Sequence, residues 1–280
     1  MPRIKINGLN VHYQQAGSGP DVVLIHAFTA NLSVWMFINI LETLAAEFRV
    51  TAYDIRGHGM TTVTPGGYTS AELAEDLRRL HAALGLGPAY LVGHSFGGVI
   101  GMHLAADHPE LVRGVILSDS YFPGLKHLEP DMGQAGPWQD LRQTIRAAGT
   151  DIGESVDFGR LFRTMAGLTP EQMGGVKQQM GAPGARWISQ ITQLAATSAA
   201  EDAFAEAGLT AERIAAVACP VVALYDEHSP FGATCRFLQE RLRDCAVEIV
   251  PGAKHVAPLQ NSEAFVELVQ KHLRRMNDRG

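Results

Sequence analysis

This sequence has little cysteine and no long apolar run. Its 280 residues include three cysteines, Cys219, Cys235 and Cys245, all in the last quarter of the chain. The small, odd number argues against a disulfide framework and favours free thiols in a reducing compartment, with a Cys235–Cys245 pair left open. No apolar stretch approaches the roughly 18 residues of a membrane-spanning helix, and the N-terminus lacks a signal-peptide pattern. We therefore expect a cytoplasmic protein that does not act in a membrane.

Clustered positive charge and the common metal-binding motifs are also absent. The net charge is −6, and no basic cluster exceeds two adjacent residues, which argues against nucleic-acid binding. The sequence contains neither an H-E-x-x-H nor a C-x-x-C motif, so we expect no bound metal. No other cofactor is expected, and the expected partner is a small molecule. The oligomeric state stays open.

The chain can bury a sizeable core, because 46% of its 280 residues are hydrophobic. That length suits one large domain with an insertion better than two independent domains. Over residues 1–121, strand patterns alternate with helical patterns, which is typical of a parallel sheet covered by helices on both faces. The expected fold class is therefore α/β with a mostly parallel sheet.

The same alternation predicts individual elements. An alternating apolar and polar segment around a glycine predicts a β-hairpin over 4–17, and continuous apolar runs predict buried strands. Helical spacing of apolar residues predicts the helices between them, and Ser70 is the expected N-cap of one. The predicted strands cover 21–28, 49–59, 89–95 and 112–120, and the predicted helices cover 33–48, 69–86 and 96–108.

The pattern changes over 122–208, which is rich in Gly, Gln, Met and Ala and has no buried-strand run. We interpret this segment as a helical cap inserted into a core formed by 1–121 and 209–280. Because the insertion joins two strands of one sheet, it should lie over the carboxyl edge, where ligands bind in open α/β sheets. Its predicted helices lie near 137–148, 154–166, 170–180 and 184–199. The core then resumes with strands near 219–226 and 246–255 and with helices near 232–242 and 262–276.

The segment "GHSFG" at 93–97 is the strongest chemical signal. It fits G-x-S-x-G between a strand and a helix, the context of a nucleophile elbow. Such a turn holds the serine in a strained conformation, and side chains at the flanking positions would collide, which explains Gly93 and Gly97. Ser95 is thus the candidate nucleophile. The alternative is a tight turn with an incidental serine.

A serine hydroxyl needs a base, and His255 is the best placed histidine. It follows the last predicted strand, in a glycine-containing loop from which it can reach the carboxyl edge of the sheet. The alternative is an ordinary surface histidine. His94 adjoins Ser95 and should have a structural role.

Two backbone N–H groups should face the negative charge that develops on the substrate oxygen. The residue after the nucleophile, Phe96, supplies one. The loop after the strand at 21–28 should supply the other, from Phe28. His26 should shape that loop through side-chain hydrogen bonds.

Along nearly its full length the chain resembles the α/β-hydrolase superfamily. The resemblance rests on "LIHAFTANLSVW", "YDIRGHG", "LVGHSFGG", "HPELVRGVILSD", "PVVALY" and "PGAKHVAPLQNSEAFVELVQKHL". It implies a serine nucleophile, a helical cap over 122–208, and structural roles for Asp54, Arg56 and Gly57. One departure is Ala27, which stands where the family commonly has a glycine that permits a positive φ.

A second departure concerns the acid that orients the histidine. The superfamily commonly places it shortly after the strand that matches 220–225, where alignment on Pro230 puts Ser229. A serine cannot stabilise an imidazolium ion as a carboxylate does. Asp119, at the end of the preceding strand, matches the acid of some members and is our preferred candidate. Asp226 remains the alternative.

These residues predict a serine hydrolase that cleaves a carboxylic ester, thioester or lactone through an acyl-enzyme. The substrate would be a small acyl compound, free or carrier-bound. The same residues also suit a C–C bond hydrolase, a perhydrolase, or a biosynthetic thioesterase or acyltransferase, and a non-catalytic binding protein stays open. A dehalogenase or epoxide hydrolase would need a carboxylate at position 95. Candidate walls of the substrate site are Trp138, Trp187, Phe122 and Phe231.

Overall fold

A computed structural model describes residues 2–130, 136–147, 149–154 and 157–279 of the protein. Its centre is an eight-stranded sheet of order β1-β2-β4-β3-β5-β6-β7-β8. The strands from β4 onward in that order are parallel, while β1 and β2 pair antiparallel at one edge. The strands are β1 (Arg3–Ile6), β2 (Leu9–Ala16), β3 (Asp21–Ile25), β4 (Arg49–Tyr53), β5 (Ala89–His94), β6 (Val112–Ser118), β7 (Val221–Asp226) and β8 (Cys245–Val250).

The predicted hairpin is formed by β1 and β2. Asn7 and Gly8 connect them, and both have positive φ, 45° and 77°. Two such residues are what a tight two-residue hairpin turn requires, and Asn-Gly supplies them with little strain. The sequence pattern therefore located this turn correctly.

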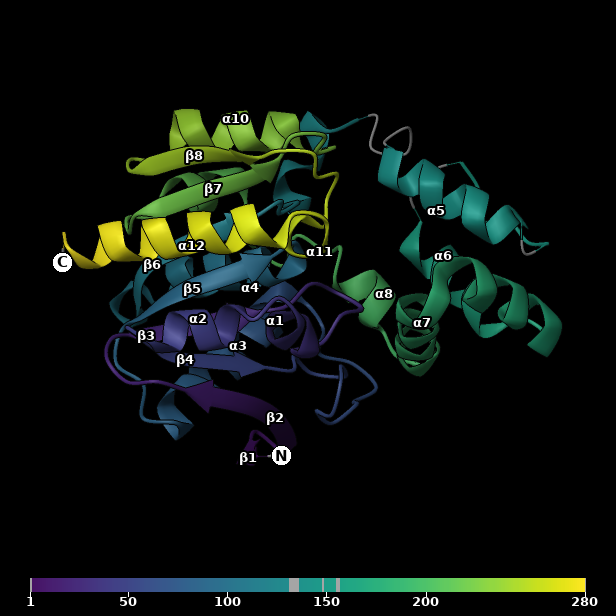
Figure 1. The fold of residues 1–280 in the computed structure, drawn as a ribbon, viewed down its shortest axis with the longest axis horizontal. Helices are drawn as coiled ribbons and strands as arrows, with labels where there is room; N and C mark the ends of the chain where they lie inside the picture. Colours follow the sequence, from purple (N-terminus) through teal and green to yellow (C-terminus); the bar gives the residue numbers. More distant parts are fainter. Residues whose placement is uncertain (1, 131–135, 148, 155–156, 280) are drawn as a thin grey trace.

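Helices cover both faces of the sheet (Figure 1). In β3, Val22 and Leu24 contact one layer and Val23 and Ile25 the other, as expected for a strand buried on both sides. The first layer contains α1 (Ser33–Phe37), α2 (Ile40–Ala45), α11 (Ala257–Gln260) and α12 (Ser262–Asn277). The second contains α3 (Ser70–Ala83), α4 (Phe96–Asp107), α9 (Ala211–Ala215) and α10 (Gly232–Arg241). Short 3-10 helices lie at Pro109–Leu111 and Pro123–Leu128.

Two details of the helices differ from prediction. The N-cap of α3 is Thr69, whose side chain accepts the N–H of Glu72 in a capping box, and not Ser70. The hydroxyl of Ser70 lies 3.0 Å from Nδ1 of buried His103 instead. The single helix predicted over 33–48 is divided into α1 and α2, because Asn39 between them adopts a left-handed conformation.

The segment predicted as a cap is helical and has its own hydrophobic cluster. Figure 1 shows α5, α6 and α7 beyond the ends toward which the parallel strands point. Its helices are α5 (Gly136–Ala147), α6 (Phe158–Ala166), α7 (Pro170–Leu194) and α8 (Ala199–Asp202). Non-helical dihedral angles at Gly181 kink α7, so the two helices predicted there adjoin across a bend. The start predicted for α6 falls partly on 155–156, outside the described residues.

Residues near both ends of the predicted insertion belong to the large core of the sheet. Phe122 and Leu125 lie in the cluster that includes α4, and so does Ala203. The helices with a separate core thus begin after and end before the boundaries of 122–208. Composition could not reveal this difference, because apolar residues suit either core equally well.

The cysteines and the helices resolve two further points. Cys219, Cys235 and Cys245 are all free thiols, so the Cys235–Cys245 pair is not formed. Among the helices that the structure describes, none combines the length and apolarity needed to cross a membrane.

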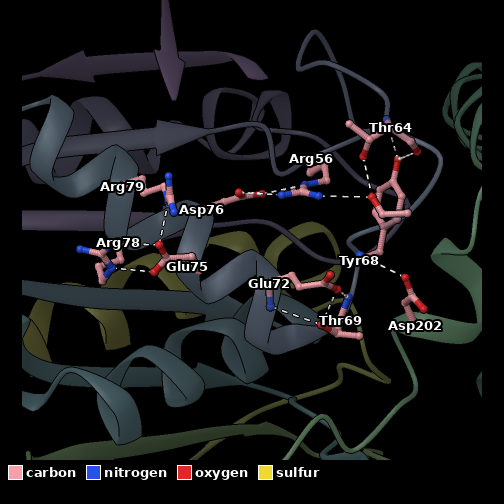
Figure 2. Close-up of polar contacts among 11 residues, drawn as sticks. Arg56, Thr64, Tyr68, Thr69, Glu72, Glu75, Asp76, Arg78, Arg79 and Asp202 are labelled. Atoms are coloured by element: carbon pink, nitrogen blue, oxygen red, sulfur yellow. Dashed lines mark hydrogen bonds and ion pairs between the residues drawn. The ribbon is translucent and has the colours of Figure 1, made fainter. Parts of the chain in front are cut away.

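Helix α3 carries one buried ion pair and two exposed ones, all visible in Figure 2. The buried carboxylate of Asp76 accepts two hydrogen bonds from Arg56, each 2.8 Å long. Arg56 also donates to the carbonyl of Gly66 at 3.2 Å, which ties down the loop after β4. On the outer side of α3, Glu75 pairs with Arg78 at 2.6 Å and with Arg79 at 2.7 Å, and all three side chains are at least one-third exposed. The buried pair therefore supports the structural role that the resemblance implied for Arg56.

Replacing Asp76 by asparagine should lower the free energy of unfolding by about 3 kcal/mol, because the guanidinium of Arg56 would stay largely buried without its counter-charge. Glu75→Gln is the matched control, because it removes the exposed ion pairs of Glu75, and it should lower the free energy of unfolding by less than about 1 kcal/mol. Urea denaturation of both variants measures the difference. Equal losses would contradict the importance assigned to the buried pair.

Candidate active site

Ser95 occupies the turn between β5 and α4. Its backbone angles are φ 52° and ψ −119°, a sparsely populated conformation for any residue other than glycine. Such strain costs on the order of 1–3 kcal/mol and persists only where the surroundings enforce it. Here the N–H of Ser95 donates to the carbonyl of Ser118 on β6 at 2.7 Å, which helps to hold the turn.

The glycines around Ser95 allow the turn to pack tightly on the sheet. A Cβ at Gly93 would overlap the backbone of Gly97, and a Cβ at Gly97 would overlap the carbonyl of Ile25 on β3. The two glycines of G-x-S-x-G are thus required by close contact, as the motif predicts.

His255 and Asp119 form a chain of contacts with Ser95. Nε2 of His255 lies 3.3 Å from Oγ of Ser95, and Nδ1 of His255 lies 2.7 Å from Oδ2 of Asp119. The side chain of Asp119 has no exposed surface, while that of His255 is 27% exposed. The structure therefore brings together the serine, the histidine and the preferred acid of the sequence prediction.

Asp119 is held at the end of β6 by its neighbour β7. Its N–H donates to the carbonyl of Leu224 at 2.9 Å, and its Oδ1 accepts the N–H of Asp226 at 3.2 Å. Its own φ is 45°. Both carboxylate oxygens are thus engaged, one by backbone and one by His255, which leaves a single orientation for the acid.

Asp226 has a different environment. Its Oδ2 accepts the N–H of Ala257 at 3.0 Å, and its Oδ1 is buried without a partner in the described structure. Burial and the nearby charge of Asp119 raise the pKa of Asp226 to about 6. Ser229, at the position where the family commonly has its acid, accepts the N–H of Phe231 at 3.0 Å. Neither side chain hydrogen-bonds the imidazole of His255.

His94 supports the backbone of His255. Its Nε2 lies 2.8 Å from the His255 carbonyl oxygen, so this nitrogen carries the proton and donates it. Burial and the neighbouring imidazole of His255 lower the pKa of His94 to about 4. The neutral ring keeps its donor at neutral pH, consistent with the structural role expected from the sequence.

The loop after β3 orients the peptide that carries the Phe28 N–H. The carbonyl of this peptide, from Ala27, accepts hydrogen bonds from Nδ1 of His26 (2.8 Å) and the N–H of Ala30 (3.0 Å). A trans peptide directs its C=O and N–H to opposite sides, so these bonds also fix the direction of the Phe28 N–H. Within the described residues, neither this N–H nor that of Phe96 has an acceptor.

Ala27 does not strain this loop. The glycine that the family commonly has here would be needed only if this position had a positive φ. Ala27 is not among the residues with positive φ. The left-handed residue is Thr29, with φ 64°. The departure from the family pattern is therefore accommodated by ordinary backbone angles at Ala27.

His26 and His58 stabilise the loop as neutral rings. His58 accepts the N–H of Thr29 at 3.0 Å and donates to the carbonyl of Arg56 at 2.8 Å. His26 accepts the N–H of Ile55 at 3.1 Å. Burial lowers the pKa of both rings, to about 3 for His58, where the adjacent His26 adds to the effect. Protonation would remove the acceptor nitrogen from each ring and break these contacts.

The four candidate wall residues have different surroundings. The ring of Phe231 meets that of His255 edge-on at a centroid distance of 5.3 Å, and Trp187 donates to Oγ1 of Thr29 at 3.0 Å. Trp138 packs with Phe158 in the separate helical core. Phe122 is wholly buried and packs in the large core cluster that includes α4, and its role as a wall stays a prediction.

Strained backbone is concentrated at this site. Seven non-glycine residues of the described chain have positive φ, and Ser95, Asp119 and His255 are three of them. Thr29, in the loop after β3 that carries the Phe28 N–H, is a fourth. Strain of this kind persists where surrounding contacts enforce a functional geometry. Across the described ranges, no group of three or more His, Cys, Asp or Glu side chains is placed to hold a metal ion.

This geometry is that of an α/β hydrolase, and comparison with known proteins agrees. The chain belongs to the alpha/beta hydrolase fold family, whose profile matches residues 20–262. An enol-lactonase from Burkholderia xenovorans has the same fold, with a TM-score of 0.71 at 20% identity, over 98% of this chain and 100% of that one.

Two curated relatives cover most of the chain. The pimeloyl-(acyl-carrier protein) methyl ester esterase of Chromobacterium violaceum is 30% identical over 275 residues, which is 95% of this chain and 98% of the relative. The 2-(acetamidomethylene)succinate hydrolase of Mesorhizobium japonicum is 29% identical over 258 residues, 90% of this chain and 87% of the relative. The first relative is named as an esterase and the second as a hydrolase.

Sequence reasoning missed three residues that support the site, namely Thr29, His58 and Gln190. Gln190 on α7 donates to the carbonyl of Gly57 at 2.8 Å and accepts the N–H of Gly59 at 3.1 Å. These contacts join segments more than 100 residues apart, so no local pattern could reveal them. The motif "YDIRGHG" marked the loop, but not what its histidine binds.

The buried state of His58 predicts a pH effect on stability. The pKa of His58 is lowered to about 3 in the folded protein. At a pH between this value and the ordinary pKa of about 6.5, the ring therefore takes up a proton when the protein unfolds. Stability should therefore fall as the pH drops from about 6.5, by about 1.4 kcal/mol per pH unit for this one proton.

In His58→Gln, the unfolding free energy should change less steeply with pH between about pH 4 and pH 5.5. The slope should be smaller by about 1.4 kcal/mol per pH unit, which is the contribution of one proton. Urea denaturation at several pH values measures both slopes. The other titrating groups are the same in both proteins, so an unchanged slope would contradict a neutral, buried His58.

Proposed function

We propose that this protein is a serine hydrolase that cleaves a carboxylic ester through an acyl-enzyme. The observation that carries the proposal is the chain Ser95 Oγ, His255 and Asp119, with contacts of 3.3 and 2.7 Å at a strained strand-to-helix turn. Membership of the fold family and the two relatives, one named as an esterase and one as a hydrolase, support hydrolytic activity.

In this mechanism His255 acts as the general base. Its Nδ1–H is bonded to Asp119, so Nε2 is free to take the hydroxyl proton of Ser95 as Oγ attacks the ester carbonyl. The carbonyl π electrons move to oxygen, and the N–H groups of Phe28 and Phe96 stabilise the oxyanion. His255 then donates its proton to the departing alkoxide, which leaves as an alcohol. Water, deprotonated by His255, releases the acid from the acyl-enzyme by the reverse sequence.

The surroundings of Phe28 support an apolar acyl group. Its ring stacks on Phe162 at 5.7 Å and meets Phe96 and Phe204 edge-on at 5.7 and 6.0 Å. One of these rings belongs to Phe96, the residue that follows the nucleophile Ser95. Thioesters and lactones have the same reacting carbonyl and remain possible substrates, and the name of one relative supports a carrier-bound acyl chain as a substrate form.

The helices α5 to α8 act in this proposal as the cap over the reacting groups. Their separate core and their place beyond the carboxyl ends of the strands support that role. Trp187 and Phe231 are the wall candidates that contact the oxyanion loop and His255.

A fluorophosphonate probe should label the wild-type protein, and Ser95→Ala should lose this labelling together with at least about a thousandfold of kcat on p-nitrophenyl esters. The matched control is Ser229→Ala, since the hydroxyl of Ser229 bonds only backbone, and it should keep both signals. A Ser95→Ala protein that is still labelled and active would overturn the proposal. A folded wild-type protein with neither signal would indicate a binding protein.

Asp119→Asn should reduce kcat by about four orders of magnitude, as loss of the acid does in serine proteases, because the amide favours the wrong histidine tautomer. Asp226→Asn should change kcat by less than about tenfold, since an amide oxygen can still accept the N–H of Ala257. Steady-state kinetics on one ester compares the variants. The opposite ranking would assign the acid to Asp226.

A further inference from the structure

Helix α7 of the cap makes a polar contact with the oxyanion loop. The indole Nε1 of Trp187 lies 3.0 Å from Oγ1 of Thr29, 158 residues earlier in the chain. Three residues further along α7, Gln190 bonds both Gly57 and Gly59 in the loop after β4. One helix of the cap thus holds two loops at the carboxyl edge of the sheet.

The direction of these hydrogen bonds is fixed by chemistry. An indole N–H can only donate, so the hydroxyl oxygen of Thr29 must accept from Trp187. The one proton of that hydroxyl is then given to the carbonyl of Phe28, at 2.6 Å. On the other side of the same peptide, the N–H of Thr29 donates to Nε2 of His58 at 3.0 Å. The peptide between Phe28 and Thr29 is therefore held at both ends.

Phe28 is consequently held at three places: the peptide before it, the peptide after it and its ring. The preceding peptide is fixed through the Ala27 carbonyl, the following peptide is fixed through Thr29, and the ring stacks on Phe162 of α6. Thr29 has a φ of 64°, a conformation that is unfavourable for a β-branched residue and needs outside support. The bond from Trp187 supplies such support from the cap.

We propose that Trp187 is a positioning residue that couples the seating of the cap to the orientation of the Phe28 N–H. This inference rests on the proposed function, in which that N–H stabilises the oxyanion. When α7 is seated, Trp187 holds Thr29, and Thr29 fixes the peptide plane that follows Phe28. When the bond is lost, Thr29 can relax out of its left-handed conformation. This change displaces Ala30, whose N–H helps to fix the Ala27 carbonyl, and the Phe28 N–H of the same peptide then turns away from the oxyanion.

The other two tryptophans show that this bond is not a general feature of buried indoles. Nε1 of Trp35 and Nε1 of Trp138 are both buried without a hydrogen-bond partner in the described structure. Trp35 stacks on Phe265 in the layer of α1 and α12, in a core cluster that includes no residue of α5 to α8. Trp35→Phe therefore removes an indole N–H without removing a hydrogen bond, which makes it a matched control.

The test compares Trp187→Phe, Thr29→Val and the double variant on one p-nitrophenyl ester. Loss of a whole oxyanion donor costs about 10²–10³ in kcat, so loss of its support should cost about 10- to 100-fold. KM should change by less than about threefold, because the oxyanion forms only in the transition state. The double variant should be no slower than the slower single variant, since both remove the same bond. Thr29→Ser keeps the hydroxyl and should retain most of the activity.

Several outcomes would overturn the inference. One is a kcat for Trp187→Phe equal to that of the Trp35→Phe control. Another is an effect confined to KM, which would make Trp187 a wall of the substrate site. Multiplying effects in the double variant would show that the two residues act separately. If Trp187→Phe does not fold, the comparison of Thr29→Val with Thr29→Ser decides the question. Failure of the proposed function is distinct, because Ser95→Ala would then remain active.

Discussion

The hydrogen bond between His255 and the buried carboxylate of Asp119 is the interaction on which the site depends. It turns Nε2 toward Ser95 and leaves the imidazole a single useful orientation. A carboxylate without exposed surface needs fixed donors, and Asp119 receives one from the backbone of Asp226. The orientation of Asp119 therefore depends on strand pairing, because the adjacency of β6 and β7 supplies the N–H that holds its carboxylate.

Buried neutral histidines support the groups around that bond. His26 and His58 order the loop that presents the Phe28 N–H, and His94 holds the backbone of His255. His26 and His58 each accept a backbone N–H through one ring nitrogen, which requires the uncharged form, while His94 donates its Nε2–H. Burial maintains that form by lowering the pKa of each ring. The organisation of the site thus depends on excluding water from these three rings.

The choice between Asp119 and Asp226 as the partner of His255 shows how far the sequence alone could locate the site. Asp119 and Asp226 follow adjacent parallel strands, so both had to lie at the same edge of the sheet and neither could be dismissed. Their surroundings differ only in three dimensions, where one carboxylate meets the imidazole and the other accepts the N–H of Ala257. The role of Phe122 was likewise open in the sequence, because an aromatic residue at the start of the insertion suits a substrate wall and a buried core equally well.

The sequence by itself determined the fold class, the strand-to-helix turn at Ser95 and the order of the chemical groups along the chain. These features follow from local causes: periods of hydrophobicity, and glycines at positions where a side chain would overlap the backbone. Only the tertiary structure decided which carboxylate faces His255, which residues of the helical insertion share a hydrophobic core, and that Trp187 reaches Thr29. Each of those depends on contacts between residues far apart in the chain, and such contacts leave no local pattern because many side chains would satisfy the same local spacing.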